Sequence, residues 1–202
     1  MNTVILAVVA YLIGSVSFAV IVSRAFRLPD PRTYGSGNPG ATNVLRSGRI
    51  SAAVITLLGD VFKGWIAVWL AARFAAPGDA ELTMALAAAL AVIGHMFPAF
   101  HRFQGGKGVA TALGVLFGFH LYIALGAAST WVIMVGFFRM SSLASITAAA
   151  FAPFATWMFY GWSHPFFASV MMVAVLLIYR HYANIKKILA GTESRLGAKA
   201  KP

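Results

Sequence analysis

Long apolar runs alternate along the chain with short polar segments that hold most of the charges. Runs of this length are typical of membrane-spanning helices, because about 20 apolar residues are needed to cross the hydrocarbon core of a bilayer. The pattern predicts helical spans near residues 1–22, 51–72, 82–100, 145–160 and 166–179. The first run lacks a basic leading segment, so we interpret it as a retained helix and not as a cleaved signal peptide.

The apolar stretch 109–138 is harder to interpret, because as a single helix it would be about 45 Å long. Basic residues flank it on both sides, Arg102 and Lys107 before it and Arg139 after it. If both flanks lie on the same side of the membrane, the stretch must cross twice. We therefore interpret it as two short helices of about 14 residues each, hinged near 118–120. The sequence then predicts an all-α membrane protein with seven transmembrane helices.

Composition supports this class and excludes two others. Of the 202 residues, 60% are hydrophobic and only 10% are charged. Soluble domains contain about 25% charged residues, so an ordinary soluble enzyme is excluded, and the apolar content is too high for a disordered chain. We expect one polytopic membrane domain over residues 1–202, with residues 182–202 as a cytoplasmic tail.

The net charge of +11 fits two explanations, membrane topology and an anion-binding site. With seven crossings, 14 of the 16 Lys and Arg residues fall on one side, in the segments 24–49, 101–108, 139–142 and 180–202. The positive-inside rule then places the N-terminus outside and the C-terminus in the cytoplasm. Because the basic residues are scattered among apolar spans, nucleic acid is not an expected partner. The chain has no cysteine, hence neither a disulfide nor a thiol nucleophile.

The first basic loop, residues 34–46, combines three glycines with several hydrogen-bond donors. Gly35, Gly37 and Gly40 match G-x-G-x-x-G, but a dinucleotide site needs a strand–helix–strand unit that membrane spans do not provide. Glycine-rich backbone can still turn its N–H groups toward one anion. The side chains that add donors are Ser36, Asn38, Thr42, Asn43 and Arg46. The alternative is an interfacial turn that only connects two helices.

The second loop, residues 94–111, places Lys107 among Gly105, Gly106 and Gly108. It is not a Walker A motif, because position 101 is His and position 108 is Gly. A lysine beside exposed backbone N–H groups at the start of a helix is nevertheless a phosphate-binding arrangement. The alternative is a cytoplasmic anchor, which explains the lysine but not the glycines.

Other polar residues support weaker interpretations. Asp60 and Lys63 share a helix face and can form an intramembrane ion pair, either functional or structural. Ser141 and Ser142 lie at a cytoplasmic edge, where a helix cap is the more common role for such residues. His181 and Asn184 project from one face at the end of the last span. No His, Asp and Glu cluster has metal-ligand spacing, so neither a metal nor a cofactor is expected.

Three segments resemble motifs of a known family. They are Ser36-Gly-Asn-Pro-Gly-Ala-Thr-Asn-Val-Leu-Arg46, Gly94-His-x-Phe-Pro with Gly105-Gly-Lys-Gly-Val-Ala-Thr111, and His181-x-x-Asn184-Ile with Gly191-Thr-Glu193. They resemble the three cytoplasmic motifs of the bacterial acyl-phosphate:glycerol-3-phosphate acyltransferases (PlsY). The resemblance runs from residue 1 to about 197 and is shortest at residues 139–142.

The resemblance implies a seven-helix enzyme of the bacterial inner membrane with its active site on the cytoplasmic face. Such an enzyme transfers a fatty acyl group from acyl phosphate to the 1-hydroxyl of glycerol 3-phosphate. The products are lysophosphatidic acid and phosphate. Acyl phosphate, glycerol 3-phosphate and membrane lipid are the implied partners, and a monomer is expected. The H-x-x-x-x-D pattern of other glycerolipid acyltransferases is absent, since no His is followed by Asp at that spacing.

Site roles follow from the resemblance as hypotheses. The expected catalytic residues are Lys107, His181, Arg46 and Ser142. The expected substrate-binding residues are Ser36, Gly37, Asn38, Gly40, Thr42, Asn43, Gly105, Gly106, Gly108 and Asn184. The general base is either His181 or the phosphate of the donor. The competing function is a transporter for a phosphorylated metabolite, which would need polar residues through both halves of the membrane.

Overall fold

The computed structural model describes residues 2–196, and within this range the chain is helical and contains no β-strand. The helices, in chain order, are α1 (Thr3–Gly14), α2 (Phe18–Ala25), α3 (Ala41–Leu45), α4 (Ile50–Phe74), α5 (Ala80–Met96), the short 3-10 helix η1 (Ala99–His101), α6 (Val109–Phe119), α7 (Leu121–Phe138), α8 (Ser141–Tyr160), α9 (Pro165–Arg180) and α10 (Tyr182–Leu189). Residues 197–202, the end of the expected tail, lie outside the described part.

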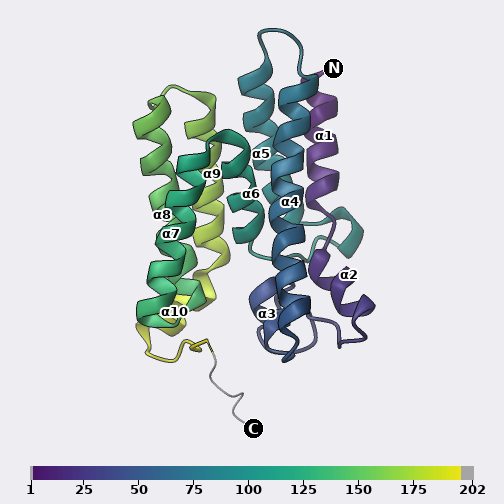
Figure 1. Cartoon of the computed structure of the whole chain (residues 1–202), viewed down its shortest axis with the longest axis vertical. Helices are drawn as coiled ribbons and strands as arrows, with labels where there is room; N and C mark the ends of the chain where they lie inside the picture. The colour runs from purple at the N-terminus through teal and green to yellow at the C-terminus, as the bar shows by residue number, and fades with distance from the viewer. Residues whose placement is uncertain (1, 197–202) are drawn as a thin grey trace.

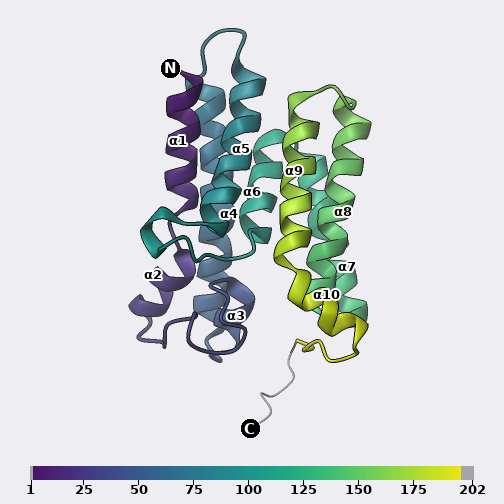
Figure 2. The same ribbon diagram turned by 180° about the vertical axis from the view of Figure 1, so that it is seen from behind.

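The long helices form two groups that run roughly parallel to one axis (Figures 1 and 2). Helices α1, α4 and α5 make one group, and α7, α8 and α9 make the other. Helix α6 lies between them and packs closely on α4, while α5 contacts α9 across the same boundary. Within the described residues, α1 begins at one end of the molecule and α10 lies at the other (Figure 1).

Five helical segments are long and apolar enough to cross a membrane: Thr3–Ala25, Ile50–Phe74, Ala80–His101, Leu121–Phe138 and Ser141–Tyr160. A sixth is counted when α9 and α10, which meet at an angle of 57°, are taken as one broken span. Helix α6 is apolar but has only 11 residues, which corresponds to about 16 Å. Large apolar side chains such as Val4 and Phe137 are exposed on the outer surface, as expected for contact with lipid.

The stretch 109–138 divides into two helices, as the sequence indicated. The break falls at His120, inside the predicted hinge, and its backbone is extended with φ −161° and ψ 122°. The two helices are unequal, with 11 residues in α6 and 18 in α7, not the equal lengths that were expected.

The first apolar run differs from the prediction of a single helix, because α1 ends at Gly14 and α2 begins at Phe18. Two contacts hold this break open. The Ser15 hydroxyl accepts a hydrogen bond from the Ala99 amide at 3.2 Å. The Lys63 ammonium donates to the Val16 carbonyl oxygen at 2.7 Å. Backbone groups released from a helix inside a membrane need such partners, and these partners come from distant parts of the chain.

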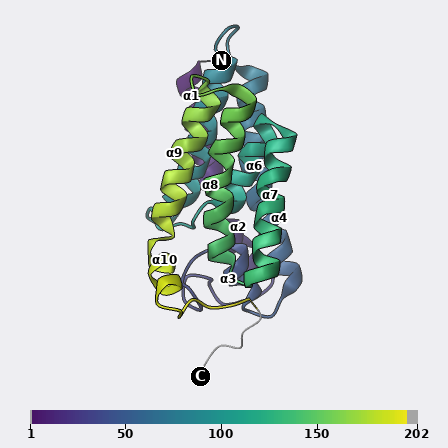
Figure 3. The ribbon, with the colours of Figure 1, turned by 90° about the vertical axis from the view of Figure 1, so that its left-hand side faces the viewer.

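The expected tail also contains structure, since residues 182–189 form the amphipathic helix α10. The segment that follows α10 passes beneath α8 and α7 (Figure 3). It is attached there by the Leu196 amide, which donates to the Arg139 carbonyl oxygen at 2.6 Å. The tail therefore closes the base of the second helix group.

Glycines allow the closest helix contacts. In the pair α4–α6, a Cβ atom on Gly114 would lie 1.9 Å from the Val61 carbonyl oxygen, and one on Gly64 would lie 2.1 Å from the Thr111 carbonyl oxygen. In the pair α1–α5, a Cβ on Gly14 would lie 2.1 Å from the Ala91 carbonyl oxygen. Small residues at helix crossings bring backbones together, which replaces the hydrophobic driving force that is missing within lipid.

We expect the substitution Gly114→Ala to push α6 away from α4 and to destabilise the fold by about 1–3 kcal/mol, the usual cost of overpacking. The measurement is thermal unfolding of the purified protein in detergent. Gly136→Ala in α7 is the matched control, because no atom lies within 4 Å of a Cβ at that position. Equal melting temperatures for the two variants would contradict the proposed contact.

Candidate active site

A cavity of about 330 Å³ opens between the two helix groups at the end that carries the basic loops. It collects residues from the first loop, the second loop, α8 and the α9–α10 junction. The predicted site residues that line it are Ser36, Asn38, Gly40, Thr42, Asn43, Arg46, Lys107, Gly108, Ser142, His181 and Asn184. Gly37, Gly105 and Gly106 do not line it.

The Asn43 side chain organises the first loop. Its amide nitrogen donates to the carbonyl oxygens of Pro31 at 2.6 Å and Tyr34 at 3.1 Å. Its amide oxygen accepts from the Ser36 amide at 3.0 Å. Both donors are therefore occupied within the loop, and Asn43 is only 2% exposed. Gly35 has φ +61°, and a Cβ there would lie 2.3 Å from the Asn43 amide oxygen, which explains the glycine.

A chain of polar contacts joins the second loop to the tail. The Lys107 ammonium donates to the Asn184 amide oxygen. The Asn184 amide nitrogen donates to Glu193 Oε1 at 2.7 Å, and the Ser142 hydroxyl donates to the same oxygen at 2.6 Å. Ser142 does not form a side-chain cap of α8. Glu193 thus gathers three predicted site residues into one cluster.

The turn at Gly105–Gly106 is held by Arg180 at the end of α9. The guanidinium donates to the Gly105 carbonyl oxygen at 2.9 Å and to the Gly106 carbonyl oxygen at 3.0 Å. Gly105 has no room for a side chain, because a Cβ there would lie 2.1 Å from the His95 carbonyl oxygen. These two glycines therefore shape the loop that presents Lys107.

The start of α6 faces the cavity. Gly108 precedes it with φ +86°, a backbone conformation that residues other than glycine rarely adopt. Gly108, Val109 and Ala110 all line the cavity. The first amides of a helix have no acceptor within the helix and carry positive potential. This end of the cavity therefore suits an anion.

Arg46 and His181 complete the polar lining. Arg46 donates to the Ser194 hydroxyl at 2.8 Å, which ties the first loop to the tail. His181 is 3% exposed, and its Nδ1 lies 2.8 Å from the Leu177 carbonyl oxygen. Because a carbonyl only accepts hydrogen bonds, Nδ1 carries the proton and the neutral ring has its lone pair on Nε2.

Burial lowers the pKa of the Lys107 ammonium to about 8. The Glu193 carboxylate opposes this by raising the pKa, while the positive charges of Arg180, Arg46 and Lys187 lower it further. An anion in the cavity would favour the charged form of Lys107. The cluster of positive side chains therefore favours binding of phosphate in this region.

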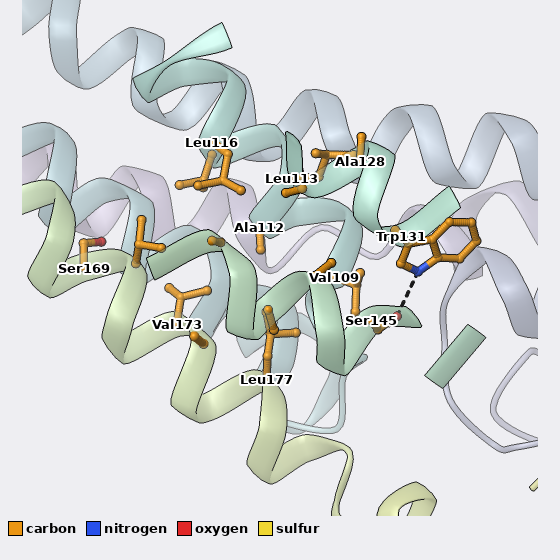
Figure 4. A pocket seen from close by; sticks show the side chains of 17 residues that line it. Val109, Ala112, Leu113, Leu116, Ala128, Trp131, Ser145, Ser169, Val173 and Leu177 are labelled. Carbon is orange, nitrogen blue, oxygen red and sulfur yellow. Dashed lines mark hydrogen bonds between the residues drawn. The ribbon is translucent and has the colours of Figure 1, made fainter. Parts of the chain in front are cut away.

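An apolar pocket lies next to this cavity, between α6, α7, α8 and α9 (Figure 4). The two share Val109, Leu113, Ala128, Trp131 and Ser145. The Trp131 indole donates to the Ser145 hydroxyl at 3.1 Å, and Figure 4 shows this pair at one end of the pocket with Ser169 and Leu116 toward the other.

The sequence did not point to Arg180 or to the organising role of Glu193. Arg180 is indistinguishable in sequence from a cytoplasmic anchor at the end of a span. Glu193 ends the last motif, but only the fold brings it to Ser142, 51 residues away. His95 and Asp60 also line the cavity.

Known proteins match this sequence along almost its whole length. A sequence model of a family described as glycerol-3-phosphate acyltransferase matches residues 4–191. The glycerol-3-phosphate acyltransferase of Ralstonia nicotianae is 57% identical over 202 residues, which cover 99% of this chain and 97% of the relative. That of Burkholderia multivorans is 56% identical and covers 100% of this chain and 94% of the relative.

Two crystal structures of PlsY (YgiH), an integral membrane glycerol 3-phosphate acyltransferase, have the same fold. The glycerol 3-phosphate form superposes with a TM-score of 0.90 at 36% identity and covers 96% of both chains. The lysophosphatidic acid form has a TM-score of 0.87 at 34% identity, with 96% of this chain and 95% of the other covered.

We expect Lys107 to lose its proton near pH 8, because burial lowers its pKa to about 8 from the ordinary lysine value. The folded protein therefore holds the charged form below pH 8 and loses it as the pH rises. The measurement is NMR titration of isotope-labelled lysines, assigned with Lys107→Arg. Glu193→Gln should lower the midpoint further, because Glu193 raises this pKa. A Lys107 midpoint near 10.5 would contradict the burial argument.

Proposed function

Because the chain belongs to the glycerol-3-phosphate acyltransferase family, we propose that it transfers a fatty acyl group from acyl phosphate to the 1-hydroxyl of glycerol 3-phosphate. The observation that carries this proposal is the convergence of two glycine-rich basic loops on one cavity that continues into an apolar pocket. Both substrates carry a phosphate, and one also carries a long apolar chain. The shape and charge of the cavity match that combination.

The reaction needs little from the protein beyond binding and charge stabilisation. The 1-hydroxyl oxygen attacks the acyl carbonyl carbon, the bond between that carbon and the phosphate oxygen breaks, and inorganic phosphate leaves. The hydroxyl proton passes to a base, for which the chain supplies Nε2 of His181. An acyl phosphate is an activated anhydride, so preorganised positive charge contributes most of the rate enhancement.

We assign the phosphate contacts to groups that face the cavity. Arg46 and Lys107 neutralise charge, and the hydroxyls of Ser36 and Thr42 donate hydrogen bonds. The Ser142 hydroxyl donates to Glu193, so it contacts phosphate only after it leaves that carboxylate. The backbone N–H groups at the start of α6 add positive potential. Asn184 orients Lys107 and the glycerol moiety. Asn43 acts indirectly, because its amide is used to shape the first loop.

The apolar pocket is the proposed site for the acyl chain. Its lining is formed almost entirely by aliphatic side chains and Trp131. It adjoins the polar cavity at Val109, so a chain bound there would place its phosphate end beside Lys107 and the start of α6. An acyl chain that enters from the bilayer is already out of water, so the pocket selects it by fit and by packing contacts.

The same proposal assigns the topology. We place α6 and α7 as a hairpin and α10 at the membrane surface, giving seven crossings with the N-terminus outside and the C-terminus in the cytoplasm. The start of α1 and the end of α10 lie at opposite ends of the molecule (Figure 1), which supports an odd number of crossings. The protein is then a single polytopic domain of the bacterial inner membrane with a cytoplasmic active site. The predicted site residues meet within one chain, so the proposed site needs no second copy, and we propose a monomer.

The test is a comparison of acyl donors with the purified protein in detergent or lipid mesophase. Palmitoyl phosphate, palmitoyl-CoA and palmitoyl carrier protein are each supplied with glycerol 3-phosphate. We expect lysophosphatidic acid and free phosphate only from palmitoyl phosphate, and at least a hundredfold loss in Lys107→Ala. Turnover with thioesters would refute the donor assignment. Absence of turnover in folded protein would leave transport as the function to test.

Blocking the apolar pocket should change the preferred chain length. Val173 lies on the pocket wall (Figure 4), so Val173→Trp should lower kcat/KM for palmitoyl phosphate at least tenfold relative to octanoyl phosphate. Val175→Trp is the matched control, because Val175 lies two residues further along α9 and is 59% exposed. An unchanged ratio in Val173→Trp would place the acyl chain elsewhere.

A further inference from the structure

A buried group of three ionisable residues lies beside the cavity. Asp60 and Lys63 come from α4, and His95 comes from α5; their exposed fractions are 2%, 2% and 8%. The Lys63 ammonium lies 2.8 Å from Asp60 Oδ1, and His95 Nδ1 lies 3.6 Å from the same oxygen. Ionisable groups inside a membrane protein are costly and are retained where they serve a purpose.

His95 touches the second glycine-rich loop through both its backbone and its ring. Its carbonyl oxygen accepts a hydrogen bond from the Gly106 amide at 3.1 Å. A Cβ on Gly106 would lie only 2.1 Å from His95 Nε2, so the imidazole fits directly against that glycine. The next residue in the chain is Lys107. The position of the imidazole therefore limits where the Lys107 backbone can lie.

The loop is thus held from two sides. Arg180 binds the carbonyl oxygens of Gly105 and Gly106 from the α9 side, and His95 contacts the same turn from the α5 side. Asp60 sits behind the imidazole, and Lys63 balances the Asp60 charge while its ammonium also binds the Val16 carbonyl oxygen in the α1–α2 break.

We propose that Asp60 and His95 are positioning residues that hold the Gly105–Gly106 turn so that Lys107 points into the cavity, and that Lys63 is the counter-ion of Asp60. This inference rests on the proposed function, because it assigns a purpose to the placement of Lys107. Asp60 fixes the ring orientation of His95, and His95 transmits that orientation to the turn by direct contact. Neither residue is required to touch a substrate.

The first test separates positioning from stability. Asp60→Asn leaves the Lys63 charge buried without a partner, which should lower the melting temperature. The double variant Asp60→Asn/Lys63→Met removes both charges and should recover most of the lost melting temperature. We expect kcat/KM with palmitoyl phosphate and glycerol 3-phosphate to stay at least tenfold below wild type in the double variant. Recovery of full activity together with stability would overturn the proposal.

The second test asks whether His95 acts through Lys107. Activities are compared for wild type, His95→Ala, Lys107→Ala and the double variant. If His95 positions Lys107, the loss caused by Lys107→Ala should be at least tenfold smaller in the His95→Ala background, because contacting residues in one unit are non-additive. Equal losses in the two backgrounds would refute the role. A purely structural effect of His95 would give such equal losses.

A matched control comes from the other end of α5. Thr83 is fully buried and its hydroxyl contacts the Thr3 hydroxyl at 2.8 Å, remote from the turn. Thr83→Val should leave kcat/KM within twofold of wild type. The activity of the wild type separates the two proposals. An inactive wild type would refute the proposed function. An active wild type together with a fully active Asp60→Asn/Lys63→Met variant would refute only the positioning role.

Discussion

The hydrogen bonds from Arg180 to the carbonyl oxygens of Gly105 and Gly106 hold the two halves of the molecule in register. Buried backbone outside regular helices must find hydrogen-bond partners within the protein. The turn at Gly105–Gly106 between η1 and α6 is such backbone, and Arg180 reaches it from the opposite helix group. The guanidinium also lies over the Phe97 ring, 5.4 Å from its centroid, which adds a cation–π interaction.

The same constraint explains why three further irregular segments have polar partners. The first loop is closed by Asn43, the α1–α2 break by Lys63 and Ser15, and the tail by Glu193. Each partner is buried or half-buried and lies on a regular helix or close to one. The loops that enclose the cavity are therefore fixed by the helices, which suits a site that relies on preorganised charge.

Much of this architecture follows from the sequence, because apolar run length and charge placement are local signals. The division of 109–138 at His120 was predictable, since thirty apolar residues with basic flanks fit a hairpin better than one span. The break at Ser15–Ser17 was not, because serine is tolerated in helices and the groups that open the break come from Ala99 and Lys63. Similarly, the glycine-rich loops identified the cavity, but only the fold shows that Asn43 supports its loop and that Glu193 joins Ser142 to Asn184.

The shortness of α6 sets the depth at which water-borne and lipid-borne reactants can meet. Helix α6 ends and helix α7 begins beside His120, and α6 has 7 fewer residues, so the end of α6 away from His120 stops about 10 Å before that of α7. The cationic loop ahead of α6 is therefore recessed below the rim of the bundle. A polar reactant has to descend from the aqueous phase to this level, while a fatty chain can stay at its normal level in the bilayer. The acyl chain therefore does not have to leave the hydrocarbon region of the bilayer for the reaction to occur.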